Sequence, residues 1–455
     1  MSIRPHSLYF VGIGGIGMSG LARYFRQLGA RVAGYDRTPS ALTDQLRAEG
    51  IDVQFDEDPQ HIPADLRKDP MNVLVVRTPA VPASSPLLAY WGEQGAGMMK
   101  RSEVLGMITS DRRTIAVAGT HGKTTVSTMV AHLLRHGGKR INAFLGGISA
   151  NYGTNVLLDP KAEINVVEAD EYDRSFLRLH PSEAIITAMD PDHLDIYGTP
   201  EAMVASYNEF AALCTGRILV HERASKALVN GQRSSYAIGG KSVPRAEQVR
   251  VQDGAYHFDL VTERGTLRDL RLGMPGRHNV ENATAAAAMA QYIGVDDERL
   301  RDGLASFRGV ERRFQVIARD AQTVFVDDYA HHPAELEATI RSARELYPGR
   351  HLTGVFQPHL FTRTRDFAPG FAYSLALLDT LYLMDIYPAR EEPIEGVTSE
   401  WLLQQVPMLD KHLLSPDDVL RLIATVRVEV LLTLGAGDID RLVPRIAEIL
   451  QHQAA

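Results

Sequence analysis

The stretch AVAGTHGKTTVS, residues 116–127, constrains the fold more than any other part of the sequence. An apolar run ends in a glycine-containing loop, and Lys123 and Thr124 then open a helical pattern that closes at Gly137. Backbone N–H groups at such a helix start, with the positive end of the helix dipole, form a cradle for anions. The lysine can place its charge between nucleotide phosphates, and the threonine hydroxyl can reach a phosphate-bound Mg²⁺. The stretch predicts a nucleotide site on an α/β sheet. Because Val117 stands where the usual loop pattern has its first glycine, a plain glycine turn before a helix is the alternative.

Apolar strand patterns alternate with helical patterns along the chain, and the alternation restarts twice. The predicted strands are SLYFVGIG, RVAGYD, NVLVVRTPA, TIAVAG, INVVEAD, EAIITAMD, TVFVDDYA, HLTGVFQP, TLYLMDIYPA and VEVLLTLGAGD. Strands that alternate with helices predict parallel sheets with helices on both faces. Between Ser234 and Gly276, short alternating runs separated by turns predict added β-hairpins. We expect three α/β domains in series: a Rossmann-like domain over 1–108, a central P-loop ATPase-type domain over 109–314 and a Rossmann-like domain over 315–455.

The first predicted strand leads into a second glycine loop, which has G-x-G-x-x-G spacing. In this pattern the glycines let the backbone approach a diphosphate at a helix start, and an acid after the next strand binds a ribose. The candidate residues are Gly12, Gly14, Gly15, Gly17 and Asp36. The motif alone does not separate NAD from another nucleotide diphosphate.

Two strands of the central domain end in acidic residues, and the second is followed by a histidine. These residues are Glu168, Asp170, Glu171, Asp173, Asp190, Asp192, His193 and Asp195. The carboxyl ends of parallel strands meet at one edge of a sheet, where one or two of these groups could complete the shell of a Mg²⁺ ion. The alternative is that most of them are solvated loop residues.

Composition disfavours several classes of protein. The net charge is −8 and no block of Lys or Arg stands out, which disfavours nucleic acid as the partner. No apolar run is long enough to cross a bilayer, and the N-terminus lacks the apolar core of a secretory signal. Cys214 is the single cysteine, which fits a reducing cytoplasm.

Seven motifs, in one order, give the chain a family resemblance. They are AGTHGKTT, VVEADEYDRSF, DPDHLDIYG, PGRHNVENA, DDYAHHP, FQPHLFTRTRDF and GAGD. Together they resemble the Mur ligases, the ATP-dependent enzymes that form amide bonds during peptidoglycan assembly. The start GIGGIGMSG and the motifs DDYAHHP and FQPH are most similar to members that join L-alanine to the lactyl carboxylate of UDP-N-acetylmuramate.

The resemblance implies the ligands and the chemistry. The N-terminal glycine loop would hold the diphosphate of the UDP-sugar, and ATP with Mg²⁺ would activate the carboxylate as an acyl phosphate. We expect a cytoplasmic protein, either a monomer or a weak homodimer. Binding of ATP would draw the central and third domains together and exclude water from the acyl phosphate.

The resemblance also implies roles for individual residues. The expected ATP contacts are Gly119, Thr120, His121, Gly122, Lys123, Thr124, Thr125, Asn279 and Asn282 at the adenine, Arg313 at the phosphates and Asp328 at the ribose. The expected metal ligands are Thr124, Glu168 and His193. The expected amino-acid contacts are Tyr329, His331, His359 and Arg363. The expected catalytic residues are Lys123, Glu168, His193, His331 and Arg363.

Two positions bear on which family member this is. Leu360 stands where the family often has arginine, which leaves the anchoring of the amino-acid carboxylate to Arg363 or Arg365. No lysine lies between Lys161 and Lys226, where several later ligases of the family carry a carbamylated lysine. This absence favours the alanine-adding members.

Two alternatives stay open at this point. A sibling ligase would attach a preformed tripeptide to the same sugar nucleotide during recycling. A nucleotide-binding module with a vestigial ATP site would bind nucleotide without turnover, but the intact GTHGKTT stretch with Glu168 and His193 disfavours it. Selectivity among L-alanine, glycine and L-serine is left open by the sequence.

Overall fold

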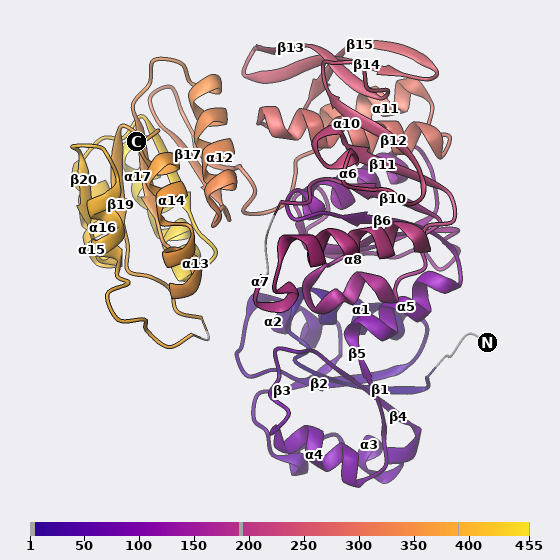
Figure 1. The fold of residues 1–455 in the computed structure, drawn as a ribbon. Coiled ribbons are helices and arrows are strands. Elements are labelled where there is room, and N and C mark those ends of the chain that lie inside the picture. The colour runs from indigo at the N-terminus through magenta and orange to yellow at the C-terminus, as the bar shows by residue number, and fades with distance from the viewer. Residues whose placement is uncertain (1–4, 191–193, 390, 455) are drawn as a thin grey trace. The chain divides into compact units, whose positions relative to one another are not determined.

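The structure is a computed structural model that describes residues 5–190, 194–389 and 391–454 (Figure 1). Its strands form three sheets, with the orders β3-β2-β1-β4-β5, β15-β14-β13-β12-β11-β10-β6-β9-β7-β8 and β16-β17-β21-β18-β19-β20. The predicted α/β class is confirmed. The chain separates into two compact units, one with residues up to 247, 260–267 and 282–304, the other with 248–259, 268–281 and 305 onward. The predicted boundaries at 108 and 314 stay a prediction.

The five-stranded sheet is parallel throughout and has helices on both faces. Its strands are β1 (Ser7–Val11), β2 (Arg31–Tyr35), β3 (Asp52–Gln54), β4 (Val73–Arg77) and β5 (Gly97–Lys100). Its helices are α1 (Ile16–Gln27), α2 (Ala41–Ala48), α3 (Ala64–Lys68), α4 (Pro86–Glu93) and α5 (Arg101–Ser110). Leu8 and Phe10 of β1 pack into the cluster that contains α1, whereas Tyr9 packs with Trp91 of α4 on the other face. This alternation follows from the two-residue period of a strand.

The ten-stranded sheet carries the phosphate loop. Its strands are β6 (Arg113–Ala118), β7 (Ile141–Ser149), β8 (Thr154–Leu157), β9 (Ile164–Glu168), β10 (Glu183–Ile186), β11 (Arg217–His221), β12 (Gln232–Ile238), β13 (Arg245–Gln252), β14 (Ala255–Thr262) and β15 (Gly265–Leu272). Its helices are α6 (Lys123–His136), α7 (Leu194–Tyr197), α8 (Pro200–Leu213), α9 (Glu222–Ser225), α10 (Arg277–Tyr292) and α11 (Asp297–Ser306). Strands β6, β7, β9, β10 and β11 are parallel, so their carboxyl ends lie at one edge. The region expected to form hairpins contains β12–β15, which extend the same sheet. The expectation is wrong for β12, which pairs parallel with both β11 and β13 and so forms no hairpin with either.

Strands β7 and β8 were missed by the sequence analysis. They pair antiparallel, and β7 pairs parallel with β9. Phe144 of β7 and Val156 of β8 belong to the same buried cluster as Leu21 and Phe25 of α1. Helix α1 of the first sheet and this end of the central sheet therefore share one core within the first compact unit.

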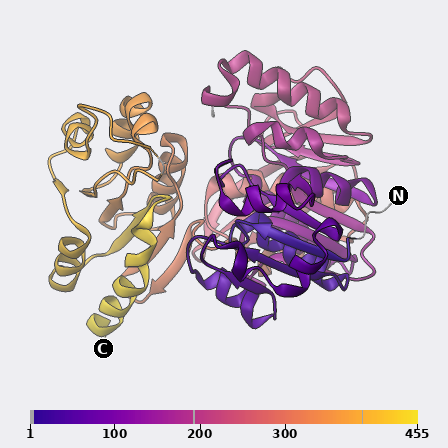
Figure 2. The same ribbon diagram turned by 90° about the horizontal axis from the view of Figure 1, so that it is seen from below.

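The six-stranded sheet has helices on both faces (Figures 1 and 2). Its strands are β16 (Gln315–Arg319), β17 (Val324–Asp328), β18 (Leu352–Phe356), β19 (Thr380–Leu383), β20 (Lys411–Leu413) and β21 (Val430–Leu434). Its helices are α12 (Pro333–Leu346), α13 (Phe361–Asp366), α14 (Ala368–Leu375), α15 (Ser399–Gln405), α16 (Pro416–Thr425) and α17 (Leu442–Ala454). All strands but β16 are parallel, so β17 and β18 end at the same edge.

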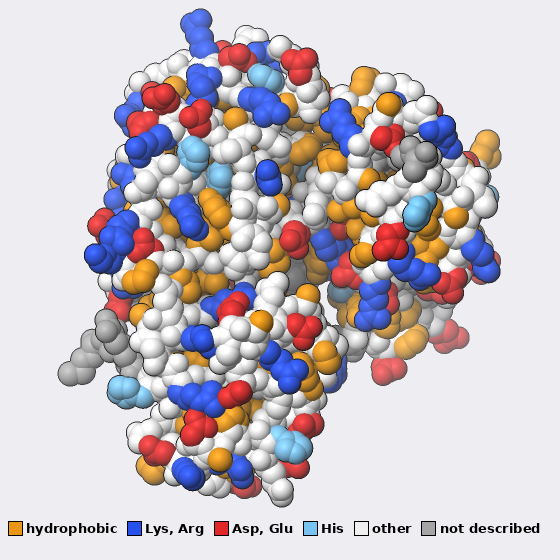
Figure 3. All heavy atoms as spheres, turned by 180° about the vertical axis from the view of Figure 1, so that it is seen from behind, with side chains coloured by type: hydrophobic (Ala, Val, Ile, Leu, Met, Phe, Trp, Pro, Cys, Tyr) orange, Lys and Arg blue, Asp and Glu red, His pale blue; other side chains and the backbone are white. Residues whose placement is uncertain are grey.

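Charges of both signs are interspersed over the face shown in Figure 3. Among the described residues, no helix combines the length and the apolar character that a bilayer span requires.

Candidate active site

The phosphate loop joins β6 to α6 and is tied to the end of β10. Gly119 has φ +134°, and a Cβ there would overlap the hydroxyl of Thr187. The Thr120 N–H donates to the Ala188 carbonyl at 3.1 Å, and the Thr120 hydroxyl accepts from the Asp190 N–H at 3.1 Å. These bonds fix the loop before any ligand binds.

Helix α6 opens directly from this loop. Its N-cap is Gly122, with φ +82°, and among the described residues no side chain caps the first turn. The first N–H groups of the helix, from Lys123 to Thr125, are therefore available to an anion. The amide oxygen of Asn282 lies 3.0 Å from the Cβ position of Gly122. The structure thus brings the predicted residues Gly119 to Thr125 and Asn282 together, with Asn282 beside the phosphate loop.

The side chain of Lys123 is buried in an ion pair. Its amino group donates to Glu171 Oε1 at 2.8 Å and to the Gly119 carbonyl at 2.7 Å, and Glu171 is fully buried. Burial lowers the pKa of Lys123, but the carboxylates of Glu171, Asp170 and Glu168 outweigh it and raise the pKa. Lys123 is therefore a cation whose local counter-charge is Glu171.

Glu168 ends β9 and lies against the backbone of β7. A Cβ on Gly146 would overlap the Glu168 carboxylate, so this strand approaches only because residue 146 is glycine. The carboxylate is cradled near Lys123, whose pKa it raises. A carboxylate and the Thr124 hydroxyl offer the oxygen ligands that Mg²⁺ prefers. The third predicted ligand, His193, lies outside the described residues.

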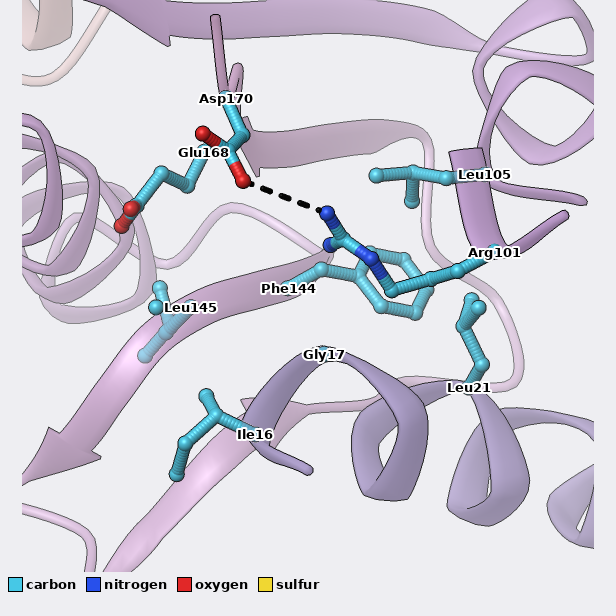
Figure 4. Close-up of a pocket in the computed structure, with 10 residues that line it drawn as sticks. Ile16, Gly17, Leu21, Arg101, Leu105, Phe144, Leu145, Glu168 and Asp170 are labelled. Carbon is cyan, nitrogen blue, oxygen red and sulfur yellow. Dashed lines mark hydrogen bonds and ion pairs between the residues drawn. The ribbon is translucent and has the colours of Figure 1, made fainter. Parts of the chain in front are cut away.

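A cavity of about 230 Å³ lies between α1, α5, β7 and the end of β9 (Figure 4). Its lining includes Gly17, Arg101, Phe144, Glu168 and Asp170. Arg101 reaches across the first turn of α1 toward Asp170, with Nη2 3.4 Å from Oδ2. The cavity therefore has a cation beside the N-terminal glycine loop and two carboxylates at the strand end.

The N-terminal glycine loop is held by β2. The N–H groups of Gly12 and Ile13 both donate to the Tyr35 carbonyl, at 2.8 and 2.9 Å, and Gly12 has φ +90°. The Gly14 N–H donates to Asp36 Oδ2 at 2.8 Å. Asp36, expected at a ribose, thus has a structural bond to the loop, and its contact with a ligand stays a prediction.

This loop leads directly into α1. Gly15 is the N-cap of the helix and Gly17 lies in its first turn, which contains no acidic residue. No side chain of the described residues caps this helix start. Its N–H groups can therefore receive a diphosphate.

In the second compact unit, Arg313 lies among predicted residues. Its guanidinium is 3.5 Å from Glu335 and 5.3 Å from the centre of the Tyr329 ring. His331 Nδ1 is 3.0 Å from the Tyr329 carbonyl oxygen and 3.2 Å from Glu335, and burial lowers the pKa of His331. A neutral imidazole is thus favoured beside the arginine.

The other predicted amino-acid contacts lie beside His331. The His331 and His359 rings are 6.1 Å apart, and Arg363 Nη1 is 3.4 Å from His359 Nδ1. Tyr387 stacks on His359 at 5.7 Å. Tyr329, His331, His359 and Arg363 therefore form one cluster, and their contact with an amino acid stays a prediction.

Asp328 and Asn279 are held by bonds to their own unit. Burial raises the pKa of Asp328 to about 6, and its carboxylate accepts from the N–H groups of Phe314 and Ala330, both at 2.8 Å. The Asn279 amide donates to the Pro275 carbonyl at 2.5 Å. Their expected ribose and adenine contacts stay predictions.

Sequence reasoning missed several residues of the site. Glu171 appeared only as one of a group of acids, and Arg101, Gly146, Glu335 and Tyr387 did not appear at all. A signal for Arg101 is its place as the first residue of α5. The start of this helix is marked by Glu103, which accepts from the Lys100 N–H as in a capping box. The others depend on contacts between distant segments, for which the sequence holds no local signal.

Three segments of the chain match models of one protein family. Residues 7–113 match the Mur ligase family catalytic domain, 117–290 the Mur ligase middle domain and 312–437 the Mur ligase glutamate ligase domain. The chain belongs to the Mur ligase family. The predicted resemblance is confirmed.

This Mur ligase is similar to curated proteins named UDP-N-acetylmuramate–L-alanine ligase. Over 98% of this chain, it is 47% identical to the Flavobacterium johnsoniae protein, covering 98% of it, and 49% identical to one from Porphyromonas gingivalis, covering 99%. The crystal structure of UDP-N-acetylmuramate–alanine ligase from Thermotoga maritima matches 98% of this chain and 99% of its own, with a TM-score of 0.82 and 26% identity. A murein peptide ligase from Psychrobacter arcticus shares the fold, with a TM-score of 0.70 and 24% identity.

Proposed function

We infer that this Mur ligase uses ATP to join L-alanine to the lactyl carboxylate of UDP-N-acetylmuramate in peptidoglycan synthesis. The observation that carries the inference is the cavity that has the start of α1 on one side and Glu168 on the other. The first turn of the helix that follows the diphosphate loop lines one side of the cavity, and the other side is lined by Glu168, which also raises the pKa of Lys123 in the phosphate loop. The arrangement suits a reaction between a nucleotide sugar and a nucleoside triphosphate, and the relatives that share nearly half of this sequence carry the name of that reaction.

The chemistry explains the need for two nucleotide sites. A carboxylate oxygen is a poor leaving group, so an amine does not displace it directly. Attack of the lactyl carboxylate on the γ-phosphate of ATP gives an acyl phosphate and ADP. The amine of L-alanine then attacks the acyl carbon, and the tetrahedral intermediate collapses to the amide and inorganic phosphate. Catalysis rests on positioning and on neutralising charge.

Lys123 is the residue that would stabilise the transferring phosphoryl group, because its ammonium lies at the start of α6. Glu168 and Thr124, with His193, would hold Mg²⁺, which when bound neutralises phosphate charge. The oxygen donors and the cradle that Gly146 leaves for Glu168 fit this ion. Arg101, at the first turn of α1, would attract the anionic part of the sugar nucleotide.

The cluster on the third sheet supplies the amino-acid site in this proposal. Arg363 would bind the alanine carboxylate, and Arg313 would contact the phosphates. The alanine ammonium must lose a proton before its nitrogen can attack. His331 would accept it, because its lowered pKa leaves the imidazole neutral. Asn279 and Asn282 would contact adenine, Asp328 the ribose, and Asp36 the uridine side of the first loop.

Phosphate release tests the function directly. We expect release from MgATP only when UDP-N-acetylmuramate and L-alanine are both present. Release that requires tripeptide in place of L-alanine would move the assignment to the recycling ligase. Absence of release with either would reject the enzyme. We further propose that the protein works in the cytoplasm, where ATP is supplied, as a monomer or weak homodimer, which sedimentation at micromolar concentration would check.

A further inference from the structure

The N-terminal glycine motif continues into Ser19 and Gly20, which the diphosphate loop does not need. Both residues lie in the second turn of α1 and are buried. They face β7 and β8 of the central sheet, because the nearest atoms to a Cβ on Gly20 are Asn155 Nδ2 at 3.6 Å, Val156 Cβ at 3.7 Å and Phe144 Cδ1 at 3.9 Å. The second half of the motif therefore serves a contact between two sheets.

Asn155 of β8 is the centre of that contact. Its amide nitrogen donates to the Ile16 carbonyl at 2.6 Å and to the Ser19 hydroxyl at 3.0 Å, and its amide oxygen accepts from Arg23 Nη1 at 2.7 Å. The side chain is almost fully buried. One amide of the central sheet thus binds α1 at three points, and two of them lie within the first four residues of the helix.

Arg23 completes the network on the other side. Its guanidinium donates to both oxygens of Glu49 at 2.9 Å and to Gln45 Oε1 at 3.1 Å. Asn155 and Arg23 are buried, whereas Glu49 is 40% exposed. At the buried end a shift leaves a donor or acceptor without a partner in a low-dielectric interior, which favours one geometry. The contact is therefore specific in angle and in register.

The network lies directly behind the reaction cavity. Ile16, whose carbonyl Asn155 binds, lines that cavity, and so does Phe144, which packs against Gly20. Gly146, two residues after Phe144 on the same strand, lies against the Glu168 carboxylate. The first turn of α1 and the Glu168 cradle are thus joined through one strand pair.

We propose that Asn155 is a positioning residue that sets the distance between the bound sugar nucleotide and the γ-phosphate. The proposal rests on the proposed function, in which the α1 start holds the UDP-sugar and the Glu168 region the phosphates. Reactions between two bound groups are sensitive to placement, and a misplacement of about 1 Å costs roughly 100-fold in rate. Neither Asn155 nor Gly20 lines the cavity, so a change there acts through geometry.

Gly20 allows a matched pair of variants. Gly20→Ala adds a methyl group at ordinary contact distances and favours the helix, so we expect its kcat to stay within about twofold of wild type. Gly20→Val adds branches that must displace Asn155 or Val156. We expect Gly20→Val to lower kcat by about 10- to 100-fold, while the Kd values of ADP and of UDP-N-acetylmuramate, each measured alone by calorimetry, change by less than about threefold.

Asn155→Asp tests the same contact by polarity. The aspartate keeps an acceptor for Arg23 but loses the donor to the Ile16 carbonyl, so the variant should fold and show the same loss of kcat with both Kd values kept. Circular dichroism and a thermal melt verify folding of each variant.

Three outcomes would overturn the proposal. One is a kcat for Gly20→Val equal to that of Gly20→Ala. The second is loss of UDP-N-acetylmuramate binding in step with kcat, which would make Gly20 part of the binding loop. The third is a normal kcat for Asn155→Asp. Failure of the wild-type protein to bind UDP-N-acetylmuramate would instead reject the proposed function.

Discussion

The buried ion pair between Lys123 and Glu171 leads to a prediction about the stability of the protein. The two charged atoms are 2.8 Å apart, the Glu171 side chain has no exposed surface and that of Lys123 is 14% exposed. Glu171→Ala would leave a buried ammonium without its nearest counter-charge. Breaking a buried pair by removing one partner costs about 3–5 kcal/mol.

The neighbouring charges place the expected value at the lower end of that range. Asp170 and Glu168 also raise the pKa of Lys123, so they compensate part of the lost charge. We expect Glu171→Ala to lower the free energy of unfolding by about 3 kcal/mol. In the double variant Lys123→Met with Glu171→Met, the loss should be smaller than in Glu171→Ala, because two apolar side chains replace the pair without leaving a buried charge.

Urea unfolding without nucleotide measures these values, and saturating MgADP gives a second measurement. Phosphate can replace the missing carboxylate, so MgADP should stabilise Glu171→Ala more than it stabilises the wild type. Asp173→Ala is the matched control in the same loop, since Asp173 is an exposed partner of Lys100 and its loss should cost at most about 1 kcal/mol. A loss below about 1 kcal/mol for Glu171→Ala, or a double variant less stable than it, would refute the reasoning.

Three further predictions concern other parts of the molecule. Gly146→Ala should displace Glu168 and lower kcat by about 100-fold or more. Gly97→Ala is the control, because its strand has room for a methyl group and its kcat should not fall. Steady-state phosphate release compares the two variants, and equal activities would contradict the role of Gly146 in placing Glu168. Burial lowers the pKa of His132 from 6.5 to about 4, so the unfolded chain binds the proton first and stability falls as pH drops from about 6.5 to about 4. The free energy of unfolding should fall by about 3 kcal/mol over this pH range. Urea titrations at several pH values should show that the free energy of unfolding of His132→Gln depends less steeply on pH. Leu360 has φ +72°, a backbone conformation that favours glycine. Leu360→Gly should therefore relieve strain and raise the free energy of unfolding by about 1 kcal/mol, with a higher melting temperature. A lower melting temperature would contradict this, because the lost side-chain packing would then outweigh the strain.

The parts of the fold that the sequence predicted correctly are those with a local signal. The apolar run before Gly119 is β6, and the helical pattern that closes at Gly137 is α6. Both were predicted because the hydrophobic periodicity of a strand or a helix can be recognised within a short stretch of sequence. Strand β7 was missed because the glycines of INAFLGGIS weaken its strand pattern. Gly146 is needed for the approach of Glu168, which lies on another strand, and a single sequence does not record such a contact.

The same distinction separates the predicted site residues from the missed ones. Lys123 follows from the phosphate-loop motif, because its role depends on the loop and helix that surround it in the chain. Glu171 stood among several acids with no feature to distinguish it. Its assignment depends on the fold that carries its carboxylate to the amino group of Lys123.

The N-terminal motif shows why a correct pattern can leave function open. The loop from Gly12 to Gly17 predicts a diphosphate site, and that chemistry is shared by NAD and UDP-sugars. What separates the two is the surface opposite the loop. There the structure places Glu168 at the end of β9 and Asp170 just after it, and the neighbouring strand β6 leads into the phosphate loop, an arrangement that suits phosphoryl transfer. The rest of the motif, Ser19 and Gly20, belongs to the contact with Asn155, 136 residues away from Ser19, that holds the two surfaces together. One short motif therefore has two roles, of which only the diphosphate site has a signal within the motif itself.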